Sequence, residues 1–190
     1  MDAEGRPTLP GAFDGACYGE RMSRSPLADA FGHHVWATLR LLDTCLQLTP
    51  AQLETTVPGT YGSILETIRH LVGADASYLF VLSGGRVAEI DEAAMDVAAL
   101  RAEIAANGRA WMSVIDGQID PDVSVVRHRH DGINSFAPLG IRLAQVVHHG
   151  TDHRSQICTA LTTLGIEPPG IDVWDFAASE GRLAEVPRTA

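Results

Sequence analysis

Apolar residues recur at helical intervals in the first part of the chain. From Leu27 to Leu48 they fall mostly three or four positions apart, which predicts an amphipathic helix. Ser25 precedes this segment and Pro26 occupies its first turn. This pair is typical of a helix start, because a serine hydroxyl accepts a free backbone N–H and proline has none to satisfy. We therefore expect the first helix over residues 27–48.

A second helix is predicted from Ile64 to Leu82, where apolar positions again follow a helical period. Ser63 and Glu66 form an S-x-x-E capping box, in which each side chain accepts a backbone N–H from the other residue. A serine followed by two glycines ends the helix. The preceding segment LTPAQLETTVPGTYGS contains two prolines and two glycines and is interpreted as a connector.

The pattern further along predicts two more helices and one irregular segment. The third helix is expected over residues 92–115, with a wide polar face. The fourth begins after Pro138 and continues to Leu164, where Gly165 and a proline pair end it. Residues 121–136 include the alternating stretch VSVVRHRH, which fits a short hairpin or an extended loop. We interpret them as a loop.

The two ends of the chain lack this periodicity. Residues 1–25 are rich in Gly, Pro, Arg and Ser and are interpreted as an N-terminal arm. Residues 26–180 are interpreted as one domain, followed by a tail over residues 181–190. Within the domain, VWDFAASE predicts a short helix that packs Trp174 and Phe176 on the rest. Four long amphipathic helices with little strand signal predict an all-α four-helix bundle.

Composition and charge narrow the function classes. Hydrophobic residues make up 45% of the 190 residues and charged ones 20%, values typical of a globular protein that folds as one domain. The 14 basic residues face 24 acidic ones, which gives a net charge of −10. Phosphate binding depends on clustered Lys and Arg, so we expect no nucleic-acid partner.

Export and membrane signals are also missing from the sequence. The segment MDAEGRPTLPGAFDGACYGE has neither a basic region nor an apolar run, and no apolar stretch reaches the roughly 18 residues that span a bilayer. Three unpatterned cysteines fit free thiols in a reducing compartment: Cys17, Cys45 and Cys158. We therefore expect a cytoplasmic protein without a membrane partner.

Histidines in the fourth predicted helix are the strongest candidates for chemistry. At about 100° per residue, His153 lies within the apolar stripe and His149 at its margin, whereas His148 falls on the opposite side. The i, i+4 spacing stacks two imidazoles on one face, as in H-x-x-x-H zinc sites. The alternative is a pair of solvent-facing or hydrogen-bonded histidines. The inward position of the pair favours a metal site. A metal ion at one ring nitrogen and a hydrogen-bond acceptor at the other would satisfy both nitrogens of each imidazole.

His70 is the third candidate ligand, because it lies beside the apolar stripe of the second helix. With the other two histidines it would form a three-nitrogen site whose remaining positions are open to water or substrate. Glu66 lies one turn earlier and could orient His70, but its capping-box role is the better interpretation. His34 lies on the apolar side of the first helix. It could line a pocket, or it could be a core histidine whose ring nitrogens are hydrogen-bonded.

The other histidines carry less signal. His33, His128 and His130 are interpreted as surface or loop residues. The pair at 128 and 130 could bind a metal weakly from an extended strand, where positions i and i+2 share a face. The Glu-x-x-His motifs of di-iron bundles are absent, which disfavours a di-iron protein.

Two segments, PGTYGSILETIRHLVGADASYL and VVHHGTDHRSQI, resemble the signature helices of the DinB/YfiT-like superfamily. In that family a histidine of the second helix and two histidines four apart in the last helix bind one metal ion, the latter within a pattern similar to N-H-x-T-H-H-R-G-Q. The resemblance assigns the ligands to His70, His149 and His153. It assigns the trailing Arg and Gln of the pattern to Arg154 and Gln156.

Three departures from this pattern leave the ligands in place. His148 stands where the pattern often has Asn, Asp152 where it often has His, and Ser155 where Gly is usual. The resemblance covers roughly residues 25–165, including the first-helix stretch HHVWATLRLL.

The resemblance implies an up-down-down-up bundle, often a homodimer, with a nickel or zinc ion. Relatives include thiol-dependent transferases and maleylpyruvate isomerases that use mycothiol or bacillithiol, beside many proteins without an assigned activity, so no single reaction is implied. Our first hypothesis is a metal-dependent hydrolase or thiol-dependent S-transferase that acts on a small molecule. The alternative is a noncatalytic metal-binding stress-response bundle with a structural ion.

Three ligands rather than four favour the enzyme, because structural zinc sites usually have four protein ligands. We expect one divalent ion, zinc or nickel, with a low-molecular-weight thiol as candidate cosubstrate. The ion would lower the pKa of bound water or thiol and so supply a nucleophile at neutral pH. Four candidate pocket residues could bind an anionic group or shuttle a proton: His34, Tyr61, Tyr78 and Arg154.

Overall fold

The computed structural model describes residues 25–116, 119–129 and 131–185, so the predicted arm lies almost entirely outside the described residues, as do Cys17 and His130. The described chain is mostly helical, as predicted. Its long helices are α1 (Pro26–Cys45), α3 (Ile64–Leu82), α4 (Val97–Ile115) and α5 (Leu139–Thr163). The shorter elements are α2 (Pro50–Leu53), the 3₁₀ turn η2 (Glu92–Ala94), the strands β1 (Ser124–His128) and β2 (Asn134–Pro138), and α6 (Val173–Ser179).

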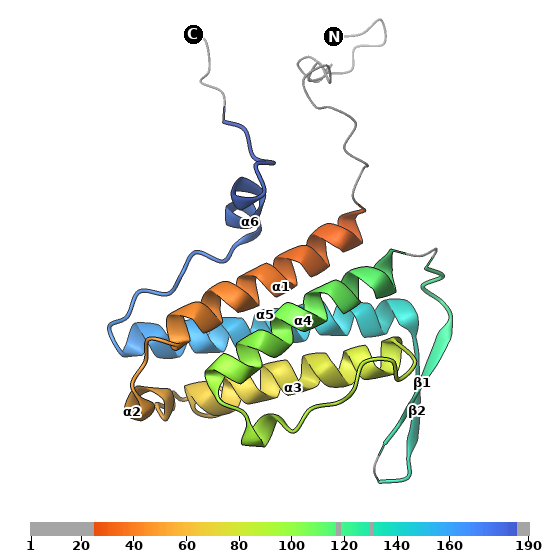
Figure 1. Cartoon of the computed structure of the whole chain (residues 1–190), viewed down its shortest axis with the longest axis horizontal. Coiled ribbons are helices and arrows are strands. Elements are labelled where there is room, and N and C mark those ends of the chain that lie inside the picture. The colour runs from red at the N-terminus through yellow and green to blue at the C-terminus, as the bar shows by residue number, and fades with distance from the viewer. Residues whose placement is uncertain (1–24, 117–118, 130, 186–190) are drawn as a thin grey trace, which may run out of the picture.

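The four long helices form an up-down-down-up bundle (Figure 1). Helices α1 and α5 run in one direction and α3 and α4 in the other, because the long connection after α3 returns along the bundle before α4 begins. Helix α1 packs on α4 and α5, and α3 packs on the same two helices. Each of the two helices that carry the candidate histidines, α3 and α5, therefore lies against the other.

Side-chain caps begin α1 and α3, as the sequence predicts. Ser25 Oγ accepts the Ala28 N–H at 3.1 Å. In the capping box of α3, Ser63 Oγ accepts the Glu66 N–H at 3.2 Å, and the Glu66 carboxylate accepts the Ser63 N–H at 2.7 Å. The predicted bounds of the second helix, Ile64 and Leu82, are those of α3.

Helix α1 ends at Cys45, earlier than the predicted Leu48, because a second capping box follows it. Thr49 Oγ1 accepts the Gln52 N–H at 3.3 Å, and Gln52 Oε1 accepts the Thr49 N–H at 2.9 Å. Pro50 disfavours helical geometry at the residue before it, so the chain must leave one helix before it starts α2. The connector interpretation missed this short helix.

The third long helix begins at Val97, not at residue 92 as predicted. Asp96 is extended, and its carboxylate accepts the Ala99 N–H at 2.8 Å. Aspartate is a strong N-cap because its side chain replaces a missing backbone partner. The residues before it form only the turn η2.

The loop interpretation of residues 121–136 is wrong, because they contain most of an antiparallel hairpin. Strands β1 and β2 pair with Val126 opposite Phe136. Arg142 of α5 fastens both strands, since its guanidinium donates to Val125 O at 2.9 and 3.2 Å and to Ser135 O at 2.9 Å. An isolated hairpin is only marginally stable. This hairpin therefore depends on support from the bundle, which a local sequence pattern does not reveal.

Only one of the two aromatic residues predicted to pack from α6 does so. Phe176 is buried, with its ring 5.6 Å from that of Trp36 and against Gly32, which leaves room for it. Trp174 is 69% exposed. Positions two apart on a helix do not share a face, so one short helix cannot bury both side chains against the same surface.

Two adjoining clusters of side chains form the core between the four long helices. One surrounds Leu71 and Leu161, and the other surrounds Phe31 and Trp111, whose rings lie 4.8 Å apart. No helix in the described part of the chain is long and apolar enough to cross a membrane.

Candidate metal centre

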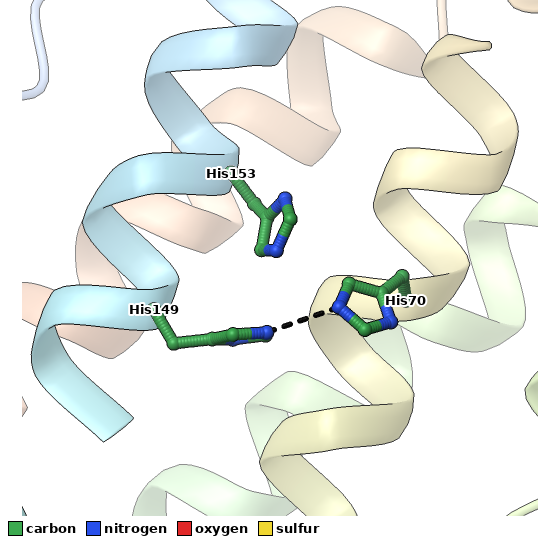
Figure 2. A group of neighbouring side chains, drawn as sticks. All are labelled: His70, His149 and His153. Carbon is green, nitrogen blue, oxygen red and sulfur yellow. Dashed lines mark hydrogen bonds between the residues drawn. The ribbon is translucent and has the colours of Figure 1, made fainter. Parts of the chain in front are cut away.

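Helices α3 and α5 bring His70, His149 and His153 together, and their rings point toward one another (Figure 2). One ring nitrogen of each lies within 4.8 Å of the others. Ring centroids are 4.4 Å apart for the two α5 histidines, and 4.7 and 5.0 Å from His70 to His153 and His149. Among the described residues, no other cluster of three or more His, Cys, Asp or Glu side chains could hold a metal ion.

The closest nitrogens have the spacing that a shared ion needs. His149 Nε2 lies 3.1 Å from His70 Nε2. Two ligand nitrogens at about 2.0–2.1 Å from zinc, at a tetrahedral angle, lie roughly 3.3 Å apart. The contact is a hydrogen bond when one of the two imidazoles carries its proton at Nε2. When both carry it at Nδ1 instead, both Nε2 lone pairs can point at a shared cation.

Gln156 determines the tautomer of His153. Its amide oxygen lies 3.1 Å from His153 Nδ1 and also accepts the Tyr61 backbone N–H at 2.9 Å. Since an oxygen can only accept, Nδ1 of His153 donates its proton, and in the neutral ring Nε2 then holds the lone pair. The family pattern includes Gln156, but its contact with His153 was not predicted. A partner of this kind is common for metal-binding histidines.

Two predicted pocket residues, Tyr61 and Tyr78, frame the histidines. The Tyr61 ring is stacked on the His70 ring, with the ring centroids 4.0 Å apart and the ring planes at 9°. The tyrosine residue itself is 57% exposed. Tyr78 stands edge-on to His149 at 5.7 Å, and its hydroxyl accepts the side-chain N–H of Gln145 at 3.3 Å. Their roles toward a substrate remain predictions.

The surroundings keep two of the imidazoles neutral. Burial, helped by repulsion from His153 and His70, lowers the pKa of His149 to about 4. Burial is also the main cause of the lowered pKa of His70, with His153 adding to it and Glu92 opposing it. Neutral imidazoles are the form that binds a metal, so at neutral pH these lone pairs need no proton removed first.

A pocket of about 390 Å³ opens beside the histidines. His70 and His149 line one part of it, and three charged residues that sequence reasoning missed line another: Glu89, Glu92 and Arg127. Gly73 explains the position of Glu92, because a Cβ there would lie 2.6 Å from the Glu92 carboxyl carbon. No local motif marks these charges, since η2 and β1 reach the site only through the fold.

The other two predicted pocket residues, His34 and Arg154, take part in a buried polar network. His34 is 1% exposed, and its Nε2 donates to Asp75 Oδ1 at 2.9 Å. Its Nδ1 accepts a hydrogen bond from Arg154 Nη1 at 3.1 Å. Asp75 also accepts from Asn107 at 3.1 Å and from Trp111 at 3.0 Å. These are the contacts of a satisfied core histidine, and neither residue lines the 390 Å³ pocket.

The network lies directly behind the candidate ligands. Arg154 follows His153 in α5, and Gly150 follows His149. A Cβ at Gly150 would lie 2.5 Å from His34 Nδ1 and 2.9 Å from Arg154 Nη1, so only glycine fits between these groups. Burial lowers the pKa of Arg154 to about 10, which leaves it charged at neutral pH opposite the carboxylate of Asp75.

The remaining histidines lie outside the cluster. His148 is exposed, in agreement with the predicted helical face. His128 is exposed and contacts Asn134 Oδ1 at 2.9 Å. His33 is only half-buried rather than fully exposed, because the C-terminal segment covers it and Ile171 O lies 2.8 Å from its Nε2. Glu66 has the predicted capping role and is no part of the histidine cluster.

Comparison with known proteins agrees with the resemblance seen in the two signature segments. No curated protein matches the chain. The sequence model of the DinB family matches residues 22–187, which include all four long helices and the three clustered histidines. The chain therefore belongs to the DinB family.

Proposed function

We propose that this protein is a metal-dependent enzyme that acts on a small molecule, with one divalent ion bound by His70, His149 and His153. The supporting observation is the convergence of three imidazole nitrogens, without a fourth ligand from the described residues in the cluster, beside a pocket of about 390 Å³. Three protein ligands leave coordination positions for water or substrate. Zinc or nickel is the expected ion, since both bind imidazole readily.

The proposed reaction is hydrolysis or thiol-dependent S-transfer. A bound divalent ion lowers the pKa of water or of a low-molecular-weight thiol, which supplies the nucleophile at neutral pH. Gln156 orients His153, and the network of Arg154, His34 and Asp75 holds α1, α3 and α5 in register behind the ligands. Tyr78 and the exposed Tyr61 are the candidates for direct contact with substrate.

A cobalt(II)-substituted sample tests this proposal. An open site should take up a thiol such as mycothiol or bacillithiol and develop a sulfur-to-cobalt charge-transfer band. Thiol transfer to small electrophiles, and hydrolysis of activated esters and amides, should then depend on the ion. A sample that binds one ion but neither thiol nor exchangeable water would instead support the noncatalytic metal-binding alternative.

We also propose a homodimer in the cytoplasm, without a nucleic-acid or membrane partner. The resemblance supports the dimer, and the exposed aromatic residues Phe136 (70%) and Trp174 (69%) are surfaces that a second copy could cover. Sedimentation at micromolar concentration tests the dimer. A monomer of 20.3 kDa would exclude it without affecting the metal site.

A further inference from the structure

A guanidinium group lines the pocket beside the histidines. Arg127 lies in β1, and the hairpin brings it to α3, where its Nη2 donates to Ser77 Oγ at 3.1 Å. Arg127 shares the 390 Å³ pocket with His70 and His149. Ser77 follows His70 by seven positions, or two helical turns, which corresponds to roughly 10 Å along one face of α3.

Most hydrogen-bonding capacity of Arg127 is unused within the described part of the chain. A guanidinium has about five N–H donors, and the bond to Ser77 uses one. No described carboxylate forms an ion pair with Arg127, whereas Arg101, Arg129 and Arg182 each pair with an aspartate. The remaining N–H groups are therefore available to a ligand.

Ser77 also links Arg127 to a carboxylate of the same pocket. Its Oγ donates to Glu89 Oε1 at 3.0 Å, so the serine lies between the carboxylate and Arg127. Glu89 and Glu92 line the same pocket, and overall charge therefore does not select an anion. A guanidinium offers a planar fork of N–H donors, which matches the two oxygens of a carboxylate.

A second cavity continues from the same arginine. It measures about 880 Å³, lies between the hairpin and the last turns of α3, and shares Arg127 and Glu89 with the first. Apolar walls come from Phe80, Val81 and Val125. Arg127 thus has the histidine cluster on one side and a partly apolar space on the other.

We infer that the pocket takes a small organic acid, with its carboxylate on Arg127 and its reactive group at the three histidines. This inference rests on the proposed function and adds the class of substrate to it. The second cavity gives room for an apolar substituent beyond the carboxylate. The separation of His70 and Ser77 along α3 sets the distance between the reactive atom and the carboxylate of the ligand. The affinity should therefore depend on the length of the ligand between these two groups.

Bifunctional probes test the inference on the cobalt(II)-loaded full chain. We would titrate a series of ω-mercaptocarboxylates of increasing length, each paired with the ω-mercaptoalcohol of equal length, and follow the sulfur-to-cobalt band. At the best length the acid should bind about tenfold more tightly than the alcohol, as expected for a charge-assisted bidentate contact. Arg127→Met should remove this preference and leave the affinity for the alcohol unchanged.

Arg129 provides the matched control. It follows β1 in the same hairpin and lines the second cavity, but its guanidinium pairs with Asp131 at 2.6 Å and does not line the histidine pocket. Arg129→Met should retain the preference for acids. Arg127→Lys, which keeps the charge but loses the fork, should retain only part of it.

Failure of the metal site and failure of the Arg127 inference can be distinguished. If the wild type binds no cobalt, or binds it but takes up neither thiol nor exchangeable water, the proposed function fails; if only the thiolate band is missing, thiol transfer fails and hydrolysis stands. Arg127 is then tested on metal-free protein, where hexanoate should shift the Arg127 side-chain N–H resonance and hexanol should not. Equal binding of acids and alcohols, a preference that survives in Arg127→Met, or an unmoved resonance with hexanoate would each overturn the inference.

Discussion

At the scale of single residues, the side chains behind the candidate ligands decide which nitrogens can bind an ion. Gln156 accepts from His153 Nδ1 and is itself held by the Tyr61 N–H. Helical geometry predicted that His149 and His153 share a face. It could not predict this orienting contact, which depends on the connector before α3 folding back onto α5.

Gln156→Ala should weaken metal binding about 10–100-fold, the usual effect of losing an orienting partner. His153 would then be free to carry its proton on either nitrogen. Gln156→Glu keeps an acceptor and should retain most of the affinity. Competition with a chelator measures both variants. Gln145→Ala, which loses only a bond to Tyr78, is the control, and an equal loss there would contradict the orienting role of Gln156.

The ligand assignment itself is tested by three histidine substitutions in α5. His149→Ala or His153→Ala should abolish stoichiometric metal binding, whereas His148→Ala should not, because His148 is exposed and turned away from the cluster. Elemental analysis of the purified variants gives the result. Retained metal in His153→Ala, or equal loss in all three, would refute the assignment.

At the scale of helices and strands, close approach of α5 to α1 depends on a glycine within a helix. Gly150→Ala should destabilise the protein by about 1–3 kcal/mol, although alanine favours helices, because the methyl group would overlap the buried His34 ring. Urea unfolding measures the change. Gly73→Ala is the contrast: its neighbour is the flexible end of Glu92, which can move aside, so stability should change little.

A Gly150→Ala protein as stable as the wild type would mean that the buried network can shift without loss. Thr38 and Arg154 would show such a shift, since Arg154 Nη1 also donates to Thr38 Oγ1 at 3.1 Å. Gly150 lies in α5 directly after His149. The need for glycine there follows only from the position of α1.

Elements with strong local signals were predictable, and those that depend on neighbours were not. The capping box at Ser63 fixed the start of α3, and the serine and glycines after Leu82 fixed its end. The hairpin shows the opposite case, because the alternation in VSVVRHRH fits a strand and a loop equally well until Arg142 holds it against α5. Asp96 is a good N-cap residue and could have marked the start of α4. The apolar residues on both sides of it suggested one continuous helix instead.

At the scale of the whole molecule, the chain order of the helices assembles the site. The up-down-down-up course sets α3 against α5, so residues far apart in the sequence such as His70 and His149 come within 3.1 Å. Periodicity indicated which face each histidine occupies and so suggested a shared three-nitrogen site, and the family resemblance assigned all three ligands to it. Glu92 and Arg127 were missed because connections between helices, rather than the helices themselves, carry them into the pocket.

The stability of the metal-free protein should fall as pH decreases from about 6.5 to about 4. In the unfolded chain a histidine has a pKa near about 6.5. In the folded chain burial lowers the pKa of His149 to about 4 and also lowers that of His70. Between these values the unfolded chain binds more protons than the folded chain, so acid favours unfolding.

Urea unfolding of metal-free protein between about pH 7 and 5 tests this dependence, because most carboxylates stay ionised over that range. His149→Gln removes the most perturbed of these imidazoles and should flatten the dependence, while His148→Ala, at an exposed position, should leave it unchanged. Zinc binds the same neutral imidazoles, so the stability it adds should shrink over the same range. Equal slopes in the two variants would mean that His149 is not the group whose protonation opposes folding.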